Sequence, residues 1–150
     1  MKKFKFRMET ILKLKKQQED EKKRVVGMLV ADINKQQQQA IELSGSLRQE
    51  GQKIKQQYLD NNVDLEEVAS YQKYVTQVQR AIQQRIANVS EIQKKLNIAR
   101  EEFLEKVKET KILEKLKEKK QSEYQAQISR LERITEDDIA MKVFLSNKIG

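Results

Sequence analysis

The sequence predicts an all-α protein, a long antiparallel two-helix coiled coil that folds as a helical hairpin. Three observations lead to this prediction: a composition that favours helix, a seven-residue apolar repeat in two stretches of the chain, and turn-forming residues between the stretches. A seven-residue repeat places one narrow apolar stripe on each helix. Two such helices are therefore stabilised by packing stripe against stripe.

The composition favours long helices over a compact globule. The chain of 150 residues has no proline, the commonest helix breaker, and only four glycines. Hydrophobic residues make up 37% and charged residues 36%. Because a typical soluble domain holds roughly 45–50% apolar residues, this chain can fill a narrow seam between two helices but not a thick core.

Two heptad repeats follow one another along the chain. In the first, six of the seven a positions are apolar, and they are Leu12, Glu19, Val26, Ile33, Ala40, Leu47 and Ile54. In the second all six are apolar: Val68, Val75, Ile82, Val89, Leu96 and Phe103. The d positions are more mixed and include Lys15, Lys22, Gln36, Glu50 and Arg85. We therefore expect a left-handed coiled coil with polar interruptions in its seam.

A run of short polar residues separates the two repeats. Asp60, Asn61 and Asn62 favour a turn, and Asp64 with Glu67 has the spacing of a helix-capping box. We expect a single coiled-coil domain over 1–150, with helix one at about 4–58, a turn at 59–63, and helix two from 65 to about 135 or beyond. The alternative is one unbroken helix that dimerises with a second chain, and the turn chemistry favours the hairpin.

The end of the chain is too apolar for a free tail. Six of the seven residues from Ile139 to Leu145 are apolar. We expect this tail to pack back on the hairpin or to dock on a partner.

The positive charge is concentrated at the N-terminal end. The chain carries a formal charge of +8, and residues 1–24 hold ten Lys or Arg against four acids. An excess at one end indicates a docking surface for an acidic partner. Direct nucleic-acid binding is disfavoured because aromatic stacking partners are scarce and no recognised module is present.

The residue types that usually carry catalysis are missing. Without histidine or cysteine the chain lacks the usual nucleophile–base pairs and the common zinc ligands. No phosphate-binding glycine loop is present either, so we expect a non-enzyme with no cofactor. No stretch of about 18 apolar residues and no signal peptide are found, which predicts a cytoplasmic protein.

Three segments carry a resemblance to a known family. They read Phe-Lys-Phe-Arg-Met-Glu at 4–9, Tyr-Gln-Lys-Tyr at 71–74 and Glu-Asp-Asp-Ile at 136–139. In this order, around a turn between two coiled-coil helices, they resemble the flagellar FliJ proteins of the type III export apparatus. The resemblance covers nearly the whole chain.

The resemblance implies a non-catalytic central stalk, similar in fold to the stalk of rotary ATPases. Such a protein is expected to bind the hexameric flagellar export ATPase, to promote assembly of its ring, and to contact the cytoplasmic domain of the export-gate membrane protein. Family members also bind export chaperones. The expected location is the cytoplasm, at the cytoplasmic face of the flagellar base, without insertion into the membrane.

Two groups of candidate binding residues follow. The resemblance maps an exposed stripe for gate contact onto helix two at Tyr74, Val78, Ala81 and Arg85, which share one helix face. For Val78 the alternative is a simple core position. The local charge makes six residues candidates for ATPase binding: Lys13, Lys15, Lys16, Lys22, Lys23 and Arg24. Their alternative is a solvated helix face.

Three other functions stay open. A general export chaperone or scaffold would use the same hairpin without entering a ring. The equivalent stalk of a virulence type III secretion system has the same sequence pattern. A nucleic-acid-associated coiled coil is the least favoured.

Overall fold

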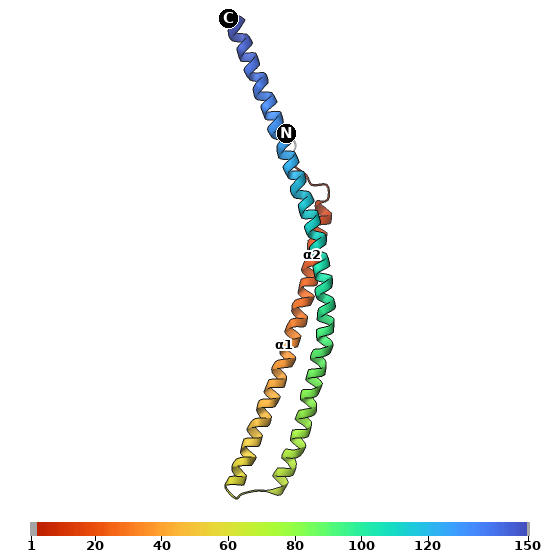
Figure 1. The fold of residues 1–150 in the computed structure, drawn as a ribbon, viewed down its shortest axis with the longest axis vertical. Helices are drawn as coiled ribbons and strands as arrows, with labels where there is room; N and C mark the ends of the chain where they lie inside the picture. Colours follow the sequence, from red (N-terminus) through yellow and green to blue (C-terminus); the bar gives the residue numbers. More distant parts are fainter. Residues whose placement is uncertain (1–2, 150) are drawn as a thin grey trace. The chain divides into compact units, whose positions relative to one another are not determined.

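The protein is a helical hairpin of two long helices that pack against each other. The computed structural model describes residues 3–149, and no strand occurs among them. Helix α1 spans Glu9–Leu59 and helix α2 spans Leu65–Ile149. Figure 1 shows the two helices joined by the short turn. The all-α hairpin expected from the sequence is thereby confirmed.

The turn is built by the residues that the sequence singled out. Asn61 has a φ of 56° and follows the end of α1. The Asn61 and Asn62 amides donate to the carbonyls of Tyr58 (3.3 Å) and Gln57 (2.9 Å). These two bonds form a Schellman motif, which satisfies carbonyls that the helix end leaves open.

Helix α2 begins with the expected cap. The Asp64 carboxylate accepts a hydrogen bond of 3.0 Å from the Glu66 amide, and the Asp64 carbonyl accepts one of 3.1 Å from the Val68 amide. An aspartate in this place satisfies one of the open amides of the first turn. The reciprocal bond from the Glu67 side chain, which would complete a capping box, is not formed.

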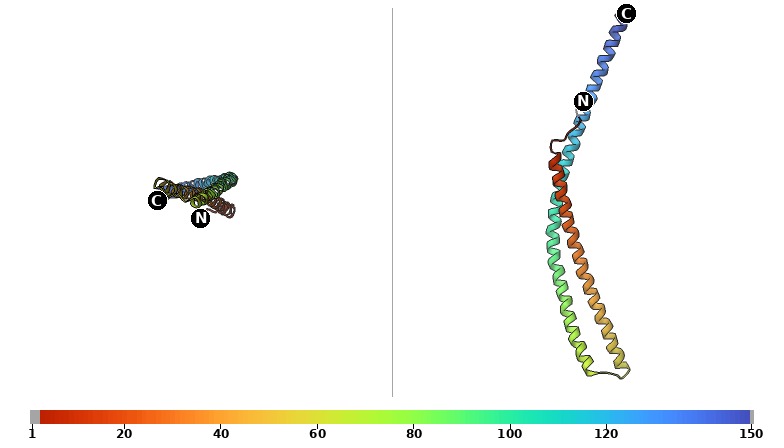
Figure 2. Two further views of the ribbon diagram at one scale, coloured as in Figure 1. Left: turned by 90° about the horizontal axis from the view of Figure 1, so that it is seen from below. Right: turned by 180° about the vertical axis from the view of Figure 1, so that it is seen from behind.

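Contacts divide the chain into two compact units, and the first is the stretch Glu21–Leu104. Within it the two helices lie side by side and run antiparallel on either side of the turn (Figures 1 and 2). The centre of its core is Ile33, Ile92 and Leu96, with four half-buried neighbours packed around them: Val26, Leu29, Val30 and Val89. All of these except Val30 are a or d positions of the two repeats.

The heptad registers hold along the whole unit. Every a and d position between Lys22 and Phe103 is buried or half-buried, the polar ones included. Three polar d positions have partners across the interface: Arg85 Nη1 donates to Gln36 Oε1 at 3.0 Å, and Lys22 Nζ lies 2.9 Å from Glu102 Oε2. The mixed d row is therefore part of the interface between the helices.

The other unit combines the residues up to Asp20 with those from Glu105 onward. Leu12 and Thr110 are its most buried residues, at 2% and 3% exposure. The Thr110 hydroxyl donates to the Lys106 carbonyl at 2.9 Å, which satisfies a buried polar group.

The first residues of this unit differ from the expectation. Helix one begins at Glu9, not near residue 4, and residues 3–6 have no regular secondary structure. Phe4, Phe6 and Met8 are half-buried, whereas Lys3, Lys5 and Arg7 between them are exposed. The three apolar side chains of this N-terminal segment are thus more covered than the cations between them. The Phe4 ring lies 5.5 Å from the Tyr124 ring on α2, measured between centroids.

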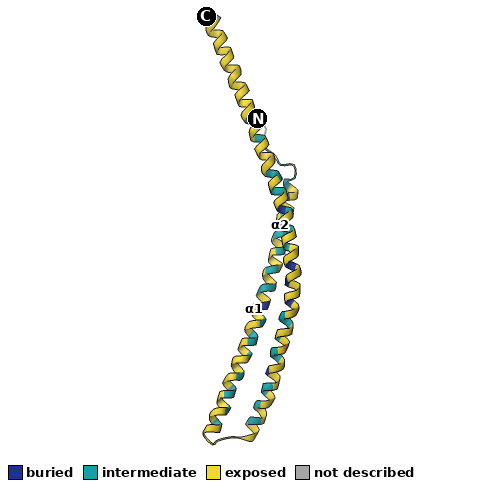
Figure 3. Ribbon diagram, in the orientation of Figure 1, coloured by how far each residue is buried: buried dark blue, intermediate teal, exposed yellow. Residues whose placement is uncertain are grey.

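The C-terminal part of α2 is uncovered within its unit. The helix continues to Ile149, well beyond 135, and residues 129–148 are all exposed. Figure 3 shows this stretch in the colour of exposed residues. Leu131 and Ile134, two large apolar residues of this stretch, are 54% and 50% exposed. Of the two expectations for the tail, packing back on the hairpin is therefore wrong, and docking on a partner stays a prediction.

Candidate interaction surfaces

The stripe mapped onto α2 lies largely in the interface between the helices. Val78 is only 5% exposed, so the expectation of an exposed stripe is wrong for this residue, which belongs to the core. Tyr74, Ala81 and Arg85 are half-buried, and Arg85 is bonded to Gln36 on α1. The physical reason is that Val78 and Arg85 are d positions. Tyr74 and Ala81, at g, lie at the edge of the seam, where a side chain can reach both a partner helix and solvent.

Tyr74 also lines a groove between α1 and α2 close to the turn. Its walls come from both helices and include Glu50, Ile54 and Gln57 from α1 and Glu67, Tyr71 and Tyr74 from α2. The groove has a volume of about 610 Å³. Gly51 leaves room for the Tyr71 ring, because a Cβ at this position would lie 2.7 Å from the Tyr71 hydroxyl.

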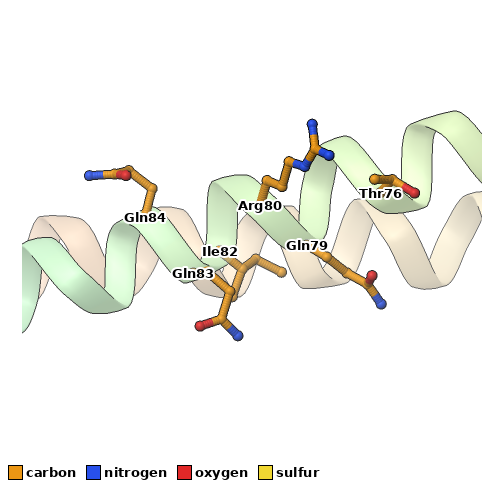
Figure 4. Close-up of a pocket in the computed structure, with 6 residues that line it drawn as sticks. All are labelled: Thr76, Gln79, Arg80, Ile82, Gln83 and Gln84. Carbon is orange, nitrogen blue, oxygen red and sulfur yellow. The ribbon is translucent and has the colours of Figure 1, made fainter.

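A second recess lies on α2 alone. It is lined by Thr76, Gln79, Arg80, Ile82, Gln83 and Gln84. In Figure 4 these side chains project from both sides of one helix and do not converge on a common point. One cation and four neutral polar side chains in this arrangement offer no pair of groups for acid–base or nucleophilic chemistry.

Of the candidate cations in the unit that holds the N-terminal residues, Lys15 and Lys16 are engaged with α2. Lys15 Nζ lies 2.9 Å from Glu109 Oε2, and Lys16 Nζ lies 3.6 Å from Glu114 Oε1. The hydrogen bonds from Lys15 and Lys106 hold the pKa of Glu109 below its ordinary value. Lys13 is exposed and forms no ion pair with any described residue.

The candidate cations of the unit Glu21–Leu104 divide in the same way. Lys22 forms the interhelical pair with Glu102, and Arg24 Nη2 donates to Glu21 Oε1 on its own helix at 2.7 Å. The bond from Arg24 lowers the pKa of Glu21, and the same bond raises the pKa of Arg24. Lys23 is exposed, and no ion pair within the described chain involves it.

Sequence reasoning missed the ion pairs between the helices. Lys15–Glu109 and Lys22–Glu102 are one heptad apart on each helix, with the numbers running in opposite directions. Lysine at d and glutamate at g, repeated after seven residues, was a signal that an explicit antiparallel alignment of the two repeats could have found. A further pair, Lys117 Nζ to Glu9 Oε2 at 2.9 Å, lowers the pKa of Glu9.

Neither a metal site nor a membrane-spanning segment is found in the part of the chain that the structure describes. No group of three or more Asp or Glu residues there is arranged to hold a metal ion. Neither helix contains, within residues 3–149, a segment apolar enough to cross a bilayer.

Comparison with known proteins gives a family match that covers most of the sequence. The family described as "Flagellar FliJ protein" matches residues 4–148 of the 150. No curated protein and no solved structure matches the sequence significantly. Because the family match spans nearly the whole sequence and the fold is the hairpin that the resemblance implies, this chain belongs to the flagellar FliJ protein family.

Proposed function

We propose that this flagellar export protein is a non-catalytic central stalk of the export apparatus, which binds the hexameric export ATPase and links it to the export gate. The observation that carries the proposal is the family match over residues 4–148, joined to a fold of two helices packed as a hairpin. The same match favours the flagellar apparatus over a virulence secretion system.

A two-helix hairpin suits the centre of a ring for a geometric reason. Each helix is about 10 Å across with its side chains, so a pair of helices is thin enough to enter a pore. Two different helices cannot contact six identical subunits in the same way. Binding would therefore make the subunits unequal and couple their nucleotide states to the orientation of the hairpin. A hairpin bound to several subunits at once would also favour ring assembly.

The exposed, unpaired lysines are the best candidates for contact with the ATPase. Among the six cations of the candidate set, Lys15, Lys16 and Lys22 pair with glutamates across the interface, and Arg24 pairs with Glu21. Lys13 and Lys23 are left to attract an acidic surface. Reversing their charge should weaken binding without breaking an ion pair between the helices.

This contact is tested by the double variant Lys13→Glu/Lys23→Glu in a binding assay with the purified export ATPase. Charge reversal at an electrostatic interface should reduce the affinity by about tenfold. This loss of affinity should be larger at lower salt concentration. The matched control is Lys35→Glu/Lys73→Glu, which makes the same charge change at two other exposed lysines without ion pairs. An equal loss of affinity in both variants would show that only the net charge matters and would contradict a specific contact.

The gate contact is tested at Tyr74. Tyr74→Ala removes a half-buried ring at the edge of the seam and should weaken binding of the gate cytoplasmic domain by about tenfold, the range of an aromatic anchor. Helicity by circular dichroism should stay unchanged. Unaltered affinity by calorimetry would eliminate this residue from the gate site.

Escort of export chaperones is a second candidate function, and the uncovered C-terminal part of α2 favours it. Ile139, Met141 and Phe144 are each more than half exposed. A helix with apolar residues around much of its circumference tends to be enclosed by a partner. A chain truncated after residue 128 should then lose chaperone binding in pull-down assays and keep binding the ATPase. Retention of both activities would exclude this role for the tail.

A further inference from the structure

The turn end of the hairpin exposes an unusual number of apolar side chains. We call residues 58–67 the hairpin tip. Its four large apolar residues are all exposed, with relative exposures of 70% for Tyr58, 64% for Leu59, 44% for Val63 and 81% for Leu65. A single exposed apolar residue is ordinary on a protein surface, but four within eight residues indicate a binding surface.

The groove between α1 and α2 lies beside the hairpin tip, and its lining residues directly precede, belong to or follow the tip in sequence. Asp64, Glu66 and Glu67 of the tip line the groove together with Tyr71 and Tyr74. Its two tyrosines offer rigid aromatic contact surface to a ligand. The tip and the groove both lie within the unit Glu21–Leu104, so they form one local surface.

The charge of the tip is opposite to that of the protein. Residues 58–67 contain four carboxylates and no Lys or Arg, in a chain of net charge +8. Asp64 is occupied in capping α2, but Glu66 and Glu67 are exposed and form no ion pair with any described residue. Lys53, the one cation that lines the groove, is held by Glu50 at 3.2 Å. The surface therefore attracts a cationic ligand and repels phosphate groups.

We propose that the hairpin tip and its groove are a docking surface for a partner protein, which contributes a segment with apolar side chains followed by Lys or Arg. The apolar residues supply burial, and the carboxylates of Glu66 and Glu67 select for positive charge. This surface goes beyond the proposed ring and gate contacts and shares only Tyr74 with the latter. A nucleic acid or an anionic membrane is disfavoured by the acidic charge, and two tips would repel each other.

The probe for the test is a synthetic helical peptide of leucine and lysine, with a twin in which every lysine is glutamate. Both are titrated against the full-length chain by fluorescence anisotropy, and hydrogen exchange locates the binding site. The lysine peptide should bind and protect amides of residues 53–74, whereas its twin should not bind. Protection of residues 129–148 alone, or equal binding of the twin, would overturn the proposal.

Charge reversal provides the decisive variant. Glu66→Lys/Glu67→Lys should weaken binding of the lysine peptide by about tenfold, because two attractive charges become repulsive. The matched control is Glu101→Lys/Glu105→Lys, an identical charge change at two exposed residues that form no ion pair. An equal loss in the control would show that only the net charge matters and would overturn the proposal.

A second variant tests the apolar contribution of the hairpin tip. It changes two side chains that lie outside the seam. Leu59→Ser/Leu65→Ser should weaken peptide binding by several fold with unchanged helicity, since both residues are mostly exposed. Ile98→Ser/Ile112→Ser, at 59% and 67% exposure, is the control and should bind as the parent does. Unchanged binding of the tip variant would overturn the proposal. Light scattering could also show that the chain self-associates head to tail and that Glu66→Lys/Glu67→Lys abolishes this association. That result would overturn the proposal too, because the occupant of the surface would then be a second copy of the chain.

Discussion

At the scale of single residues, the reversal of the chain depends on one backbone conformation. Asn61 is the only residue other than glycine with a positive φ in the described part of the chain. Asparagine tolerates this region because its short polar side chain can interact with nearby backbone groups. The Schellman bonds from Asn61 and Asn62 depend on that conformation. Local sequence therefore sets where the hairpin turns.

Substitution at Asn61 tests this role. Asn61→Val should lower the free energy of unfolding by about 1–2 kcal/mol, because a β-branched residue is strained at positive φ. Asn61→Gly should leave stability unchanged or raise it slightly, since glycine adopts this conformation without steric cost. Thermal unfolding followed by circular dichroism measures both. Equal stability of the two variants would contradict the assigned role.

The glycines inside α1 make a second prediction at this scale. A Cβ at Gly45 would meet nothing within 4 Å, whereas one at Gly51 would meet the Tyr71 hydroxyl at 2.7 Å. Gly45→Ala should therefore raise stability by roughly 0.5–1 kcal/mol through better helix propensity. Gly51→Ala should gain less, because Tyr71 must move. A larger gain at Gly51 than at Gly45 in thermal melts would be inconsistent with this packing.

At the scale of the helices, the polar seam positions serve to align α1 with α2. Arg85 and Gln36 lie 49 residues apart in sequence and are joined by a hydrogen bond inside the interface. Shifting one helix along the other would leave both groups half-buried without a partner, and such a loss disfavours alternative registers. Apolar residues alone would tolerate several registers. The polar pair thus trades some stability for a unique alignment.

A double-mutant cycle separates these two effects. Gln36→Leu alone should destabilise the protein by about 1 kcal/mol, because the Arg85 guanidinium loses its acceptor. The combination Gln36→Leu/Arg85→Leu should be more stable than the parent, since apolar pairs at seam positions pack without desolvating a charge. Thermal melts of the four proteins give the coupling. A double variant less stable than both single variants would contradict this explanation.

At the scale of the whole molecule, ion pairs link the stability of the hairpin to pH. Hydrogen bonds from lysines on the opposite helix lower the pKa of Glu9 and of Glu109 below the ordinary value of 4.5. A carboxylate with a lowered folded-state pKa stabilises the fold above its ordinary pKa. That stabilisation is lost as the pH falls through the folded-state value. The hairpin should therefore melt at lower temperature below about pH 4.5.

The variant Lys117→Gln isolates the contribution of Glu9. Without the Lys117 ammonium, the pKa of Glu9 should return toward 4.5, so the melting temperature should fall less between about pH 6 and pH 3 than it does in the parent. The matched control is Lys119→Gln, which removes an exposed lysine without an ion pair. An identical acid-induced decrease in the parent and both variants would refute the linkage.

Membership of the FliJ family places the molecule in flagellar protein export. Fewer of the candidate binding residues are available to partners than the sequence predicts. Four of the six candidate cations are paired inside the chain, and Val78 is buried. Eleven of the twenty large apolar residues that are exposed in the described part of the chain lie at the hairpin tip or on the uncovered part of α2. Binding studies should therefore focus on these two surfaces and on Lys13 and Lys23.

Features that depend only on neighbouring residues could be predicted from the sequence. Heptad spacing placed the seam on the correct face of both helices, and Asp64 was identified as the cap of α2 at Leu65. These predictions succeed because helical periodicity, turns and caps are set within a few residues.

The residue that each seam position faces could not be predicted in this way, because it depends on how the two helices pack. Lys15 and Glu109 are 94 residues apart, so their ion pair exists only in one alignment of the two helices. Packing within each unit likewise buries Val78, places the Phe4 ring beside the Tyr124 ring, and leaves residues 129–148 exposed. A repeat shows which residues form an interface, but the pairing of residues across it depends on register. Long-range contacts select that register, and they are not encoded in any local stretch of the chain.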